Sequence, residues 1–208
     1  MNISINKIEK MIEKFSKGNM KVFYLEKREE IFNLIEKLVP EKSTIGCGDS
    51  VTLEEIGLYD FFRNEKYIFL DKYRAGITKK EKQKNYIDNF DTDTFISSAN
   101  AITEDGKIFN IDGNGSRIAP IIYGPKQVII VVGTNKIVEN IEEARDRARN
   151  IAAPLDAIRL GKKTPCASVK SCVDCNSHDR ICNFFVEITG HFIKDRIKII
   201  IINEKLGY

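Results

Sequence analysis

The sequence has few of the features that mark membrane, secreted or nucleic-acid-binding proteins. No apolar run approaches the roughly 18 residues that a membrane-spanning helix needs. Residues 1–7 lack the apolar core and the small-residue cleavage site of a signal peptide. The 33 basic and 30 acidic side chains leave a formal net charge of only +3, which does not indicate a surface built for nucleic acid or membranes. We therefore expect a cytoplasmic protein with no membrane span and no nucleic-acid partner.

The sequence also lacks the residue patterns of several familiar catalytic sites. It contains only two histidines, His178 and His191, and neither has the partners of a Ser-His-Asp arrangement. Its glycine-rich segments lack the Lys-Ser/Thr pair of a P-loop, and none is a full dinucleotide-binding fingerprint. The carboxylates are scattered, so the spacing of residues identifies no catalytic group.

The composition and the periodicity are those of a globular α/β protein. The chain of 208 residues, 42% apolar and 30% charged, is long enough to bury a core as one domain over residues 1–208. Apolar spacing predicts helices over 3–16, 27–38, 78–89 and 141–153, and strands over 21–25, 43–47, 67–70, 127–132 and 196–203. Because helices and strands alternate, we expect a mostly parallel sheet flanked by helices on both faces.

Local patterns refine this fold. Thr52 and Glu55 have the spacing of a capping box, which predicts a helix start there. An Asp-Gly pair at 105–106, between two apolar stretches, predicts a hairpin. The continuous β-branched run over 127–132 predicts a strand covered on both faces. Residues 160–185 form a cysteine-rich loop, and loops of that length are uncommon unless they are functional or organised by a metal.

Two glycine-rich segments are candidate ligand sites. The first contains Gly46, Gly48, Asp49 and Ser50, which follow a predicted strand and precede a predicted helix. Open α/β sheets bind ligands at this position, and the free amides of a helix start attract anions. The alternative interpretation is a tight turn from strand to helix.

The second segment follows the predicted hairpin and contains Asp112, Gly113, Asn114, Gly115 and Arg117. Its glycines permit a nest of backbone amides, and an arginine suits a bidentate pair with a carboxylate or phosphate. The alternative is an ordinary turn, with Arg117 in a surface ion pair.

Lys136 follows the strand predicted over 127–132, again at a carboxyl end. Its charge suits an anionic substrate, although a solvated lysine at the start of a loop is the alternative. Together the three segments predict a pocket for a small anionic metabolite, either a carboxylate or a phosphate.

Four of the five cysteines, Cys166, Cys172, Cys175 and Cys182, fall within 17 residues. In a reducing compartment such a cluster suggests a metal site before a disulfide framework. Four thiolates suit a tetrahedral zinc ion or an iron–sulfur cluster, and thiol redox chemistry or inert thiols are the alternatives. The isolated Cys47 is expected to be a buried, unreactive thiol.

An ordered series of motifs runs through the second half of the chain. It comprises Ser98-Ala99-Asn100, Thr103-Glu104-Asp105-Gly106, the segment 112–117, Gly124-Pro125, Gly133-Thr134-Asn135-Lys136, Ala153-Pro154, Thr164-Pro165-Cys166 and the cysteine cluster up to Cys182. As a set, these motifs resemble the LUD-domain family of lactate-utilisation proteins (LutC/YkgG-like). The resemblance is closest to a short stand-alone branch with a cysteine-rich C-terminal loop.

The resemblance implies an α/β fold related to the sugar-phosphate isomerase, CoA-transferase and formyltetrahydrofolate cyclo-ligase superfold. It also implies a component of lactate-to-pyruvate oxidation, or of related 2-hydroxy and 2-oxo acid redox metabolism, that works with iron–sulfur or dehydrogenase partner subunits. CoA transferases of the related fold use a glutamate nucleophile, for which Glu104 is the positional candidate. Two alternatives remain: a nucleotide- or CoA-handling transferase or ligase of the same superfold, and a non-catalytic partner subunit stabilised by metal.

Overall fold

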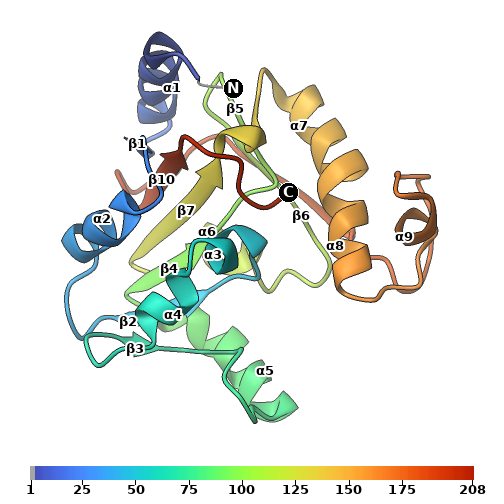
Figure 1. Ribbon diagram of the computed structural model, residues 1–208, viewed down its shortest axis with the longest axis horizontal. Helices are drawn as coiled ribbons and strands as arrows, with labels where there is room; N and C mark the ends of the chain where they lie inside the picture. Colours follow the sequence, from blue (N-terminus) through green and yellow to red (C-terminus); the bar gives the residue numbers. More distant parts are fainter. Residues whose placement is uncertain (1–2) are drawn as a thin grey trace.

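Strand β7 (Gln127–Gly133) lies in the middle of a six-stranded parallel sheet. Every residue of this strand after Gln127 is buried, as the β-branched run predicts for a strand covered on both faces. The computed structural model describes residues 3–208 (Figure 1). Its main sheet has the strand order β1-β10-β7-β4-β2-β3, and all neighbouring strands are parallel. The predicted α/β class with a mostly parallel sheet is therefore confirmed.

The other strands of the main sheet lie close to their predicted positions, except β4, which was expected only as part of an apolar stretch leading into the hairpin. They are β1 (Lys21–Leu25), β2 (Thr44–Cys47), β3 (Ile68–Phe69), β4 (Thr94–Ser97) and β10 (Ile197–Ile202). Strand β3 is only two residues long, lies at the edge of the sheet and pairs with β2 alone.

Helices cover both faces of this sheet, as expected. Helix α1 (Ile5–Lys17) buries Met11 and Phe15 against one face, where Val128 and Ile130 of β7 point. The opposite face receives Ile129 of β7 and is covered by α2 (Glu30–Leu38), α3 (Val51–Glu55) and α4 (Leu58–Phe62). The alternation of side chains along β7 therefore divides the apolar core into two layers.

A second sheet, which the sequence did not indicate as a separate unit, lies beside the first. Its order is β8 (Ile137–Val138), β5 (Ala101–Thr103), β6 (Ile108–Asp112) and β9 (Phe184–Ile188). Strands β5 and β6 form the predicted antiparallel hairpin, and Gly106 turns the chain with a φ of +94°. Strand β9 was not predicted, because four of its five residues are exposed or half-buried and show no clear alternation.

The hairpin joins two cores. Ile108 packs in the layer shared with α1, while its neighbour Phe109 packs with Ala144 and Ala148 on the other side. These alanines belong to a helical column that begins with α7 (Ile141–Arg147) and stands next to the second sheet in Figure 1.

This helical column is longer than the predicted helix, which ended at residue 153. It passes through a π-helical turn at Ala148–Ala152 and continues as α8 (Ala153–Arg159). Pro154 lies in the first turn of α8 and has no N–H to donate, so the usual ladder of hydrogen bonds is interrupted there. The extra turns bring Arg159 to the edge of the main sheet.

The predicted capping box at Thr52 is wrong. Helix α3 begins after Ser50, whose side chain accepts a hydrogen bond from the Leu53 amide. A capping box does occur at α5 (Lys79–Asp88), where Thr78 and Glu81 cap each other. Thr52 is fully buried within α3, where its hydroxyl has tertiary partners instead.

Two further short helices are α6 (Ile118–Ile122) and α9 (Pro165–Val169), and single 3-10 turns lie at Asn89–Asp91 and Thr134–Lys136. Helix α9 lies inside the segment that was expected to be an irregular cysteine-rich loop. Among residues 3–208, no helix has the length and apolar character required to cross a membrane.

We predict that Gly124→Ala destabilises the protein more than Gly76→Ala. Both glycines have a positive φ, of +108° and +75°, so both alanines incur about 1–2 kcal/mol of backbone strain. A Cβ at Gly124 would also lie 2.5 Å from the Phe90 carbonyl oxygen, whereas a Cβ at Gly76 meets open space. Urea unfolding should show a loss at Gly124 that exceeds the loss at Gly76 by about 1–3 kcal/mol. Equal losses would contradict the packing described here.

Candidate functional site

Three neighbouring strands, β2, β4 and β7, end at the same edge of the parallel sheet. Asp49 and Ser50 follow β2, Ser98 and Asn100 follow β4, and Lys136 follows β7. Open α/β sheets bind ligands outside the carboxyl ends of their strands. The structure thus brings together loops that lie far apart in the sequence.

Two adjoining cavities occupy this edge. The smaller measures about 70 Å³ and is lined by Asp49, Ser50, Val51, Ser98, Ala99, Asn100, Arg117, Lys136, Asp156, Arg159 and Tyr208. The larger measures about 480 Å³, shares four of these residues and extends to Asp112, Gly113 and Asn114. Most of the residues singled out from the sequence therefore line one continuous region.

Lys136 is buried against the smaller cavity, with 3% of its surface exposed. Its Nζ donates to Thr52 Oγ1 at 2.9 Å and to Ser98 Oγ at 3.1 Å. Burial, reinforced by the positive charges of Arg147 and Arg117, lowers the pKa of Lys136 to about 7. Within residues 3–208 this side chain forms no ion pair with a carboxylate. It is therefore not the solvated lysine of the alternative interpretation.

Arg117 also lines both cavities, but its guanidinium binds the protein itself. Its two Nη atoms donate four hydrogen bonds of 2.6–3.1 Å to Ser98 O, Asn100 Oδ1, Asn110 Oδ1 and Ile111 O. The nearest carboxylate in an ion pair with it, Asp112, lies 3.9 Å from Nε. The sequence suggested that Arg117 makes a bidentate pair with a ligand. In the structure its guanidinium instead binds the loop after β4 and strand β6, while its positive charge stays at the cavity.

Arg147 is a third cation in this region and comes from α7. It is 7% exposed, its Nε donates to the Asn135 carbonyl at 3.0 Å, and its Nη1 donates to the Asn100 carbonyl. Burial lowers its pKa. The side chain joins the loop after β4 to the loop after β7, and it adds a charge that no carboxylate of residues 3–208 pairs with.

The amides of the loop at 112–117 point toward Asp112. Its Oδ1 accepts the backbone N–H groups of Asn114 and Gly115, and its Oδ2 accepts those of Arg117 and Ile118, at 2.9–3.3 Å. The expected nest is therefore filled by a carboxylate of the chain, which braces the loop and the start of α6.

The glycines of the first segment provide close packing instead of lining either cavity. A Cβ at Gly48 would lie 2.5 Å from Ser97 Oγ, and one at Gly46 would clash with Asn89 Oδ1. Between them, Cys47 is 1% exposed, and burial raises the pKa of its thiol to about 12. The expectation of a buried thiol is confirmed, and the raised pKa agrees with the low reactivity that was expected.

Asp49 is paired inside the protein. Its Oδ1 lies 3.3 Å from Lys72 Nζ and accepts a hydrogen bond from the Tyr73 hydroxyl. Burial acts to raise the pKa of Asp49, but Lys72 and Tyr73 outweigh it, so the pKa lies below its ordinary value. Lys72 Nζ also lies 5.3 Å from the ring centre of Tyr73 and 5.4 Å from that of Tyr86. The charge of this carboxylate is therefore already balanced.

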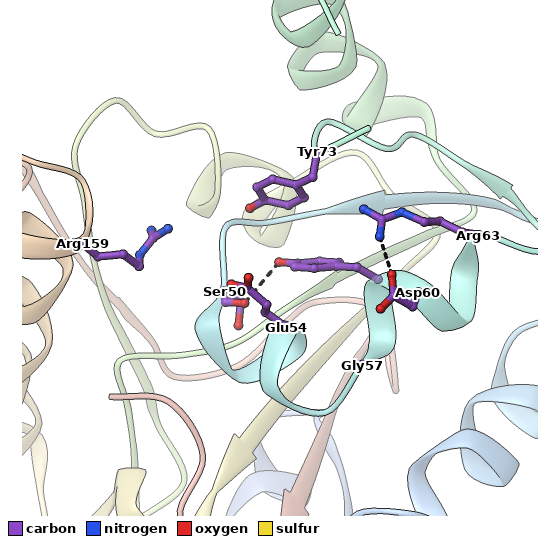
Figure 2. Close-up of a pocket in the computed structure, with 8 residues that line it drawn as sticks. Ser50, Glu54, Gly57, Asp60, Arg63, Tyr73 and Arg159 are labelled. Carbon is purple, nitrogen blue, oxygen red and sulfur yellow. Dashed lines mark hydrogen bonds and ion pairs between the residues drawn. The ribbon is translucent and has the colours of Figure 1, made fainter. Parts of the chain in front are cut away.

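Arg159 reaches the site from the end of α8. Its Nε donates to Asp156 Oδ1 at 2.8 Å and to the Tyr208 hydroxyl at 3.0 Å. Figure 2 shows this guanidinium facing a third cavity of about 340 Å³, with the ring of Tyr73 on the far side. Because Arg159 and Ser50 line both this cavity and the smallest one, the two cavities adjoin.

The structure adds functional candidates that sequence reasoning missed. They are Thr52, Ser98, Asn100, Arg147 and Arg159. The positions of Ser98 and Asn100 just after a strand were the available signal. Nothing in the sequence indicated that Arg159 lies at the site, because its position depends on the π-helical turn that precedes α8.

The cysteines of residues 160–185 do not assemble as a metal site here. Among residues 3–208, no three His, Cys, Asp or Glu side chains are placed to hold a metal ion, and the thiols are free. Instead, Arg149 contacts Cys172 Sγ at 3.5 Å, and Arg180 donates to the Cys175 carbonyl at 3.1 Å. The residues as arranged do not fit zinc or an iron–sulfur cluster, and the metal site stays a prediction from the sequence.

We predict that Lys136→Met changes how stability depends on pH. The folded pKa of about 7 lies below the unfolded value near ~10.4, so the unfolded state binds more protons between these values. The free energy of unfolding of the unsubstituted protein therefore rises with pH across that window, and this contribution is lost as pH falls toward 7. Between about pH 7 and about pH 10, urea unfolding should show the free energy of unfolding of the unsubstituted protein rising by about 2–4 kcal/mol more than that of Lys136→Met. The exposed Lys10→Met serves as the control, and identical pH slopes for both variants would refute the lowered pKa.

Comparisons with known proteins place the chain in a family. No curated protein matches the sequence significantly. A DUF162 family protein from Deinococcus radiodurans is similar in structure, with 12% identity, a TM-score of 0.49, and coverage of 96% of this chain and 98% of that chain. eIF2B beta from Chaetomium thermophilum is a more distant likeness, with 13% identity, a TM-score of 0.35, and coverage of 65% and 47%. The family model of the LUD domain matches residues 8–202. Because that match spans nearly the whole chain, the protein belongs to the LUD-domain family.

Proposed function

We propose that the smaller cavity at the carboxyl edge of the sheet binds a small 2-hydroxy or 2-oxo acid. In this proposal the protein is a component of lactate-to-pyruvate oxidation, or of closely related redox metabolism, as lactate utilisation in the family suggests. The observation that carries the proposal is the buried Lys136, which lines the cavity without a carboxylate partner among residues 3–208.

The balance of charge around the cavity supports an anionic ligand. Asp49 is paired with Lys72, and Asp156 is paired with Arg159. Lys136, Arg147 and Arg117 then remain. Asp112 lies 3.9 Å from Arg117, and Glu55 attracts Lys136 without forming an ion pair with it. Because cations buried without anions are costly, a bound carboxylate would offset an existing electrostatic penalty.

The size of the cavity favours a short acid. At about 70 Å³ the cavity has room for only a few heavy atoms. A three-carbon acid matches that space and presents one carboxylate. The oxygen on C2, as a hydroxyl or carbonyl, would meet the hydrogen-bonding groups of Ser98 and Asn100 that line the same cavity.

Oxidation of a 2-hydroxy acid to a 2-oxo acid releases two electrons and two protons. The proposal therefore includes a redox partner, an iron–sulfur or dehydrogenase subunit, that accepts the electrons. In this arrangement the chain supplies binding and orientation of the acid.

A second candidate function is a transferase or ligase that handles a nucleotide or CoA. The larger cavity, of about 480 Å³, favours it, because that space suits a larger ligand and is lined by Lys82, Lys162 and Arg180. Phosphate groups would be the recognised feature in this case.

Binding measurements distinguish the two functions. We predict that titration calorimetry detects binding of lactate or pyruvate to the protein. Arg159 lines the smaller cavity, so Arg159→Gln should weaken the affinity by about 10-fold or more because a charge-assisted hydrogen bond to the carboxylate is lost. Arg63→Gln is the matched control, since Arg63 lines only the neighbouring cavity and pairs with Asp71. Binding of ATP or CoA without binding of either acid would contradict the proposal and favour the second function.

The predicted metal site has its own test. If the cysteines close around a metal, protein purified without oxygen should contain iron with visible absorbance, or zinc, and Cys175→Ala should lower the metal content. Because metal binding couples to folding, a structural site also predicts lower stability of that variant. Metal-free, colourless protein with four titratable thiols in the cluster would overturn the metal prediction.

A further inference from the structure

The Nζ atom of Lys136 lies between two hydroxyl groups, an arrangement that suits a neutral amine. Its Nζ lies 2.9 Å from Thr52 Oγ1 and 3.1 Å from Ser98 Oγ. Each hydroxyl also has a backbone carbonyl near it, Leu206 for Thr52 and Ala99 for Ser98. A hydroxyl can accept a hydrogen bond from a protonated lysine or donate one to the lone pair of a neutral lysine. The two hydroxyls can therefore bind Lys136 in either protonation state.

The charged groups around Lys136 favour the neutral amine. The guanidinium groups of Arg147, on α7, and of Arg117, just before α6, repel a further positive charge at Lys136. Glu55 of α3 opposes them with a weaker attraction. Burial and the two arginines together lower the pKa of Lys136 to about 7, so a large share of the molecules carry a free lone pair at neutral pH.

We propose that Lys136 Nζ is a nucleophile that forms an imine with the C2 carbonyl of a 2-oxo acid bound in the smaller cavity. This inference rests on the proposed function and narrows it, because a 2-hydroxy acid has no carbonyl to react. A lysine that is desolvated and placed near other cations is the form of lysine that attacks carbonyl groups.

The reaction balances without an oxidant or a reductant. The lone pair of Nζ adds to C2, and the carbonyl oxygen takes up a proton to give a carbinolamine. The hydroxyl of this adduct then leaves as water as the C=N bond forms. Over both stages, the two hydrogens of the amine leave with the carbonyl oxygen, so lysine and 2-oxo acid give imine and water.

The neighbouring residues suit these stages. Thr52 and Ser98 contact Nζ directly and can relay protons between the nitrogen and the departing oxygen. Arg159 lines the same cavity and is free enough, with about a third of its side chain exposed, to meet the substrate carboxylate. That carboxylate would also stabilise the positive charge of a protonated imine.

Reduction of the imine tests the proposal on the unsubstituted, full-length protein. The protein is incubated with pyruvate and sodium cyanoborohydride, which converts an imine to a stable secondary amine, spares the ketone and persists at mildly acidic pH. The modified lysine is located by peptide mass spectrometry. We expect one adduct per chain, at Lys136, and none when lactate replaces pyruvate. The yield should fall as pH drops below about 7, because the protonated amine is not nucleophilic.

Controls separate this inference from the binding proposal. Lys126→Met, at an exposed surface lysine, should keep the adduct, and Lys136→Met should lose it while remaining folded by circular dichroism. Pyruvate binding by calorimetry without any adduct at Lys136 would overturn the inference and leave the proposed function in place. The absence of both binding and adduct would overturn both, and adducts spread over many surface lysines would also refute a specific nucleophile. The adduct is mapped on the unsubstituted chain, so the test does not depend on whether the methionine variant folds.

Discussion

The need to cover both faces of a parallel sheet is the constraint on which the rest of this structure depends. Strands β7 and β10 are almost entirely apolar and are buried on both sides. One side is closed by α1 and the β5–β6 hairpin, and the other by α2, α3 and α4. Because each covering element must cross from one strand end to the next strand start, the carboxyl ends collect at one edge and leave their loops there. The candidate site is a consequence of this packing.

At that edge, polar side chains tie the loops together, and the cations outnumber their partners. Arg117 and Arg147 donate to carbonyl and amide oxygens from two loops and from strand β6, and Asp112 binds four backbone amides of the segment that follows it. These contacts tie the segments that form the wall of the cavity to one another. Burial lowers the pKa of Lys136, and the positive charge that these contacts leave beside it lowers that pKa further. The same positive charge makes the cavity suitable for an anion. The same arrangement therefore supports both binding and reactivity.

Sequence reasoning succeeded where a local pattern and the tertiary packing agree. The strand at 127–132, the hairpin at 105–106 and the alternation of helix and strand were all predicted, because apolar periodicity reports directly which face is buried. It failed where packing overrides local preference. Thr52 has the spacing of a helix cap, but its hydroxyl binds Lys136, and Ser50 caps the helix instead. Strand β9 is an edge strand with little burial, so its side chains carry no periodic signal.

The sequence by itself determined the α/β class, the LUD-type motif set and the loops that end at the carboxyl edge, because these depend on residue order and local periodicity. Only the tertiary structure decided which groups act together there. It buried Lys136 between Thr52 and Ser98, filled the loop at 112–117 with its own carboxylate, and brought Arg159 to the cavity through a π-helical turn. Burial sets the pKa of each side chain, and hydrogen bonds between distant segments decide which of its polar groups stay available to a ligand. Neither property can be read from the spacing of residues along the chain.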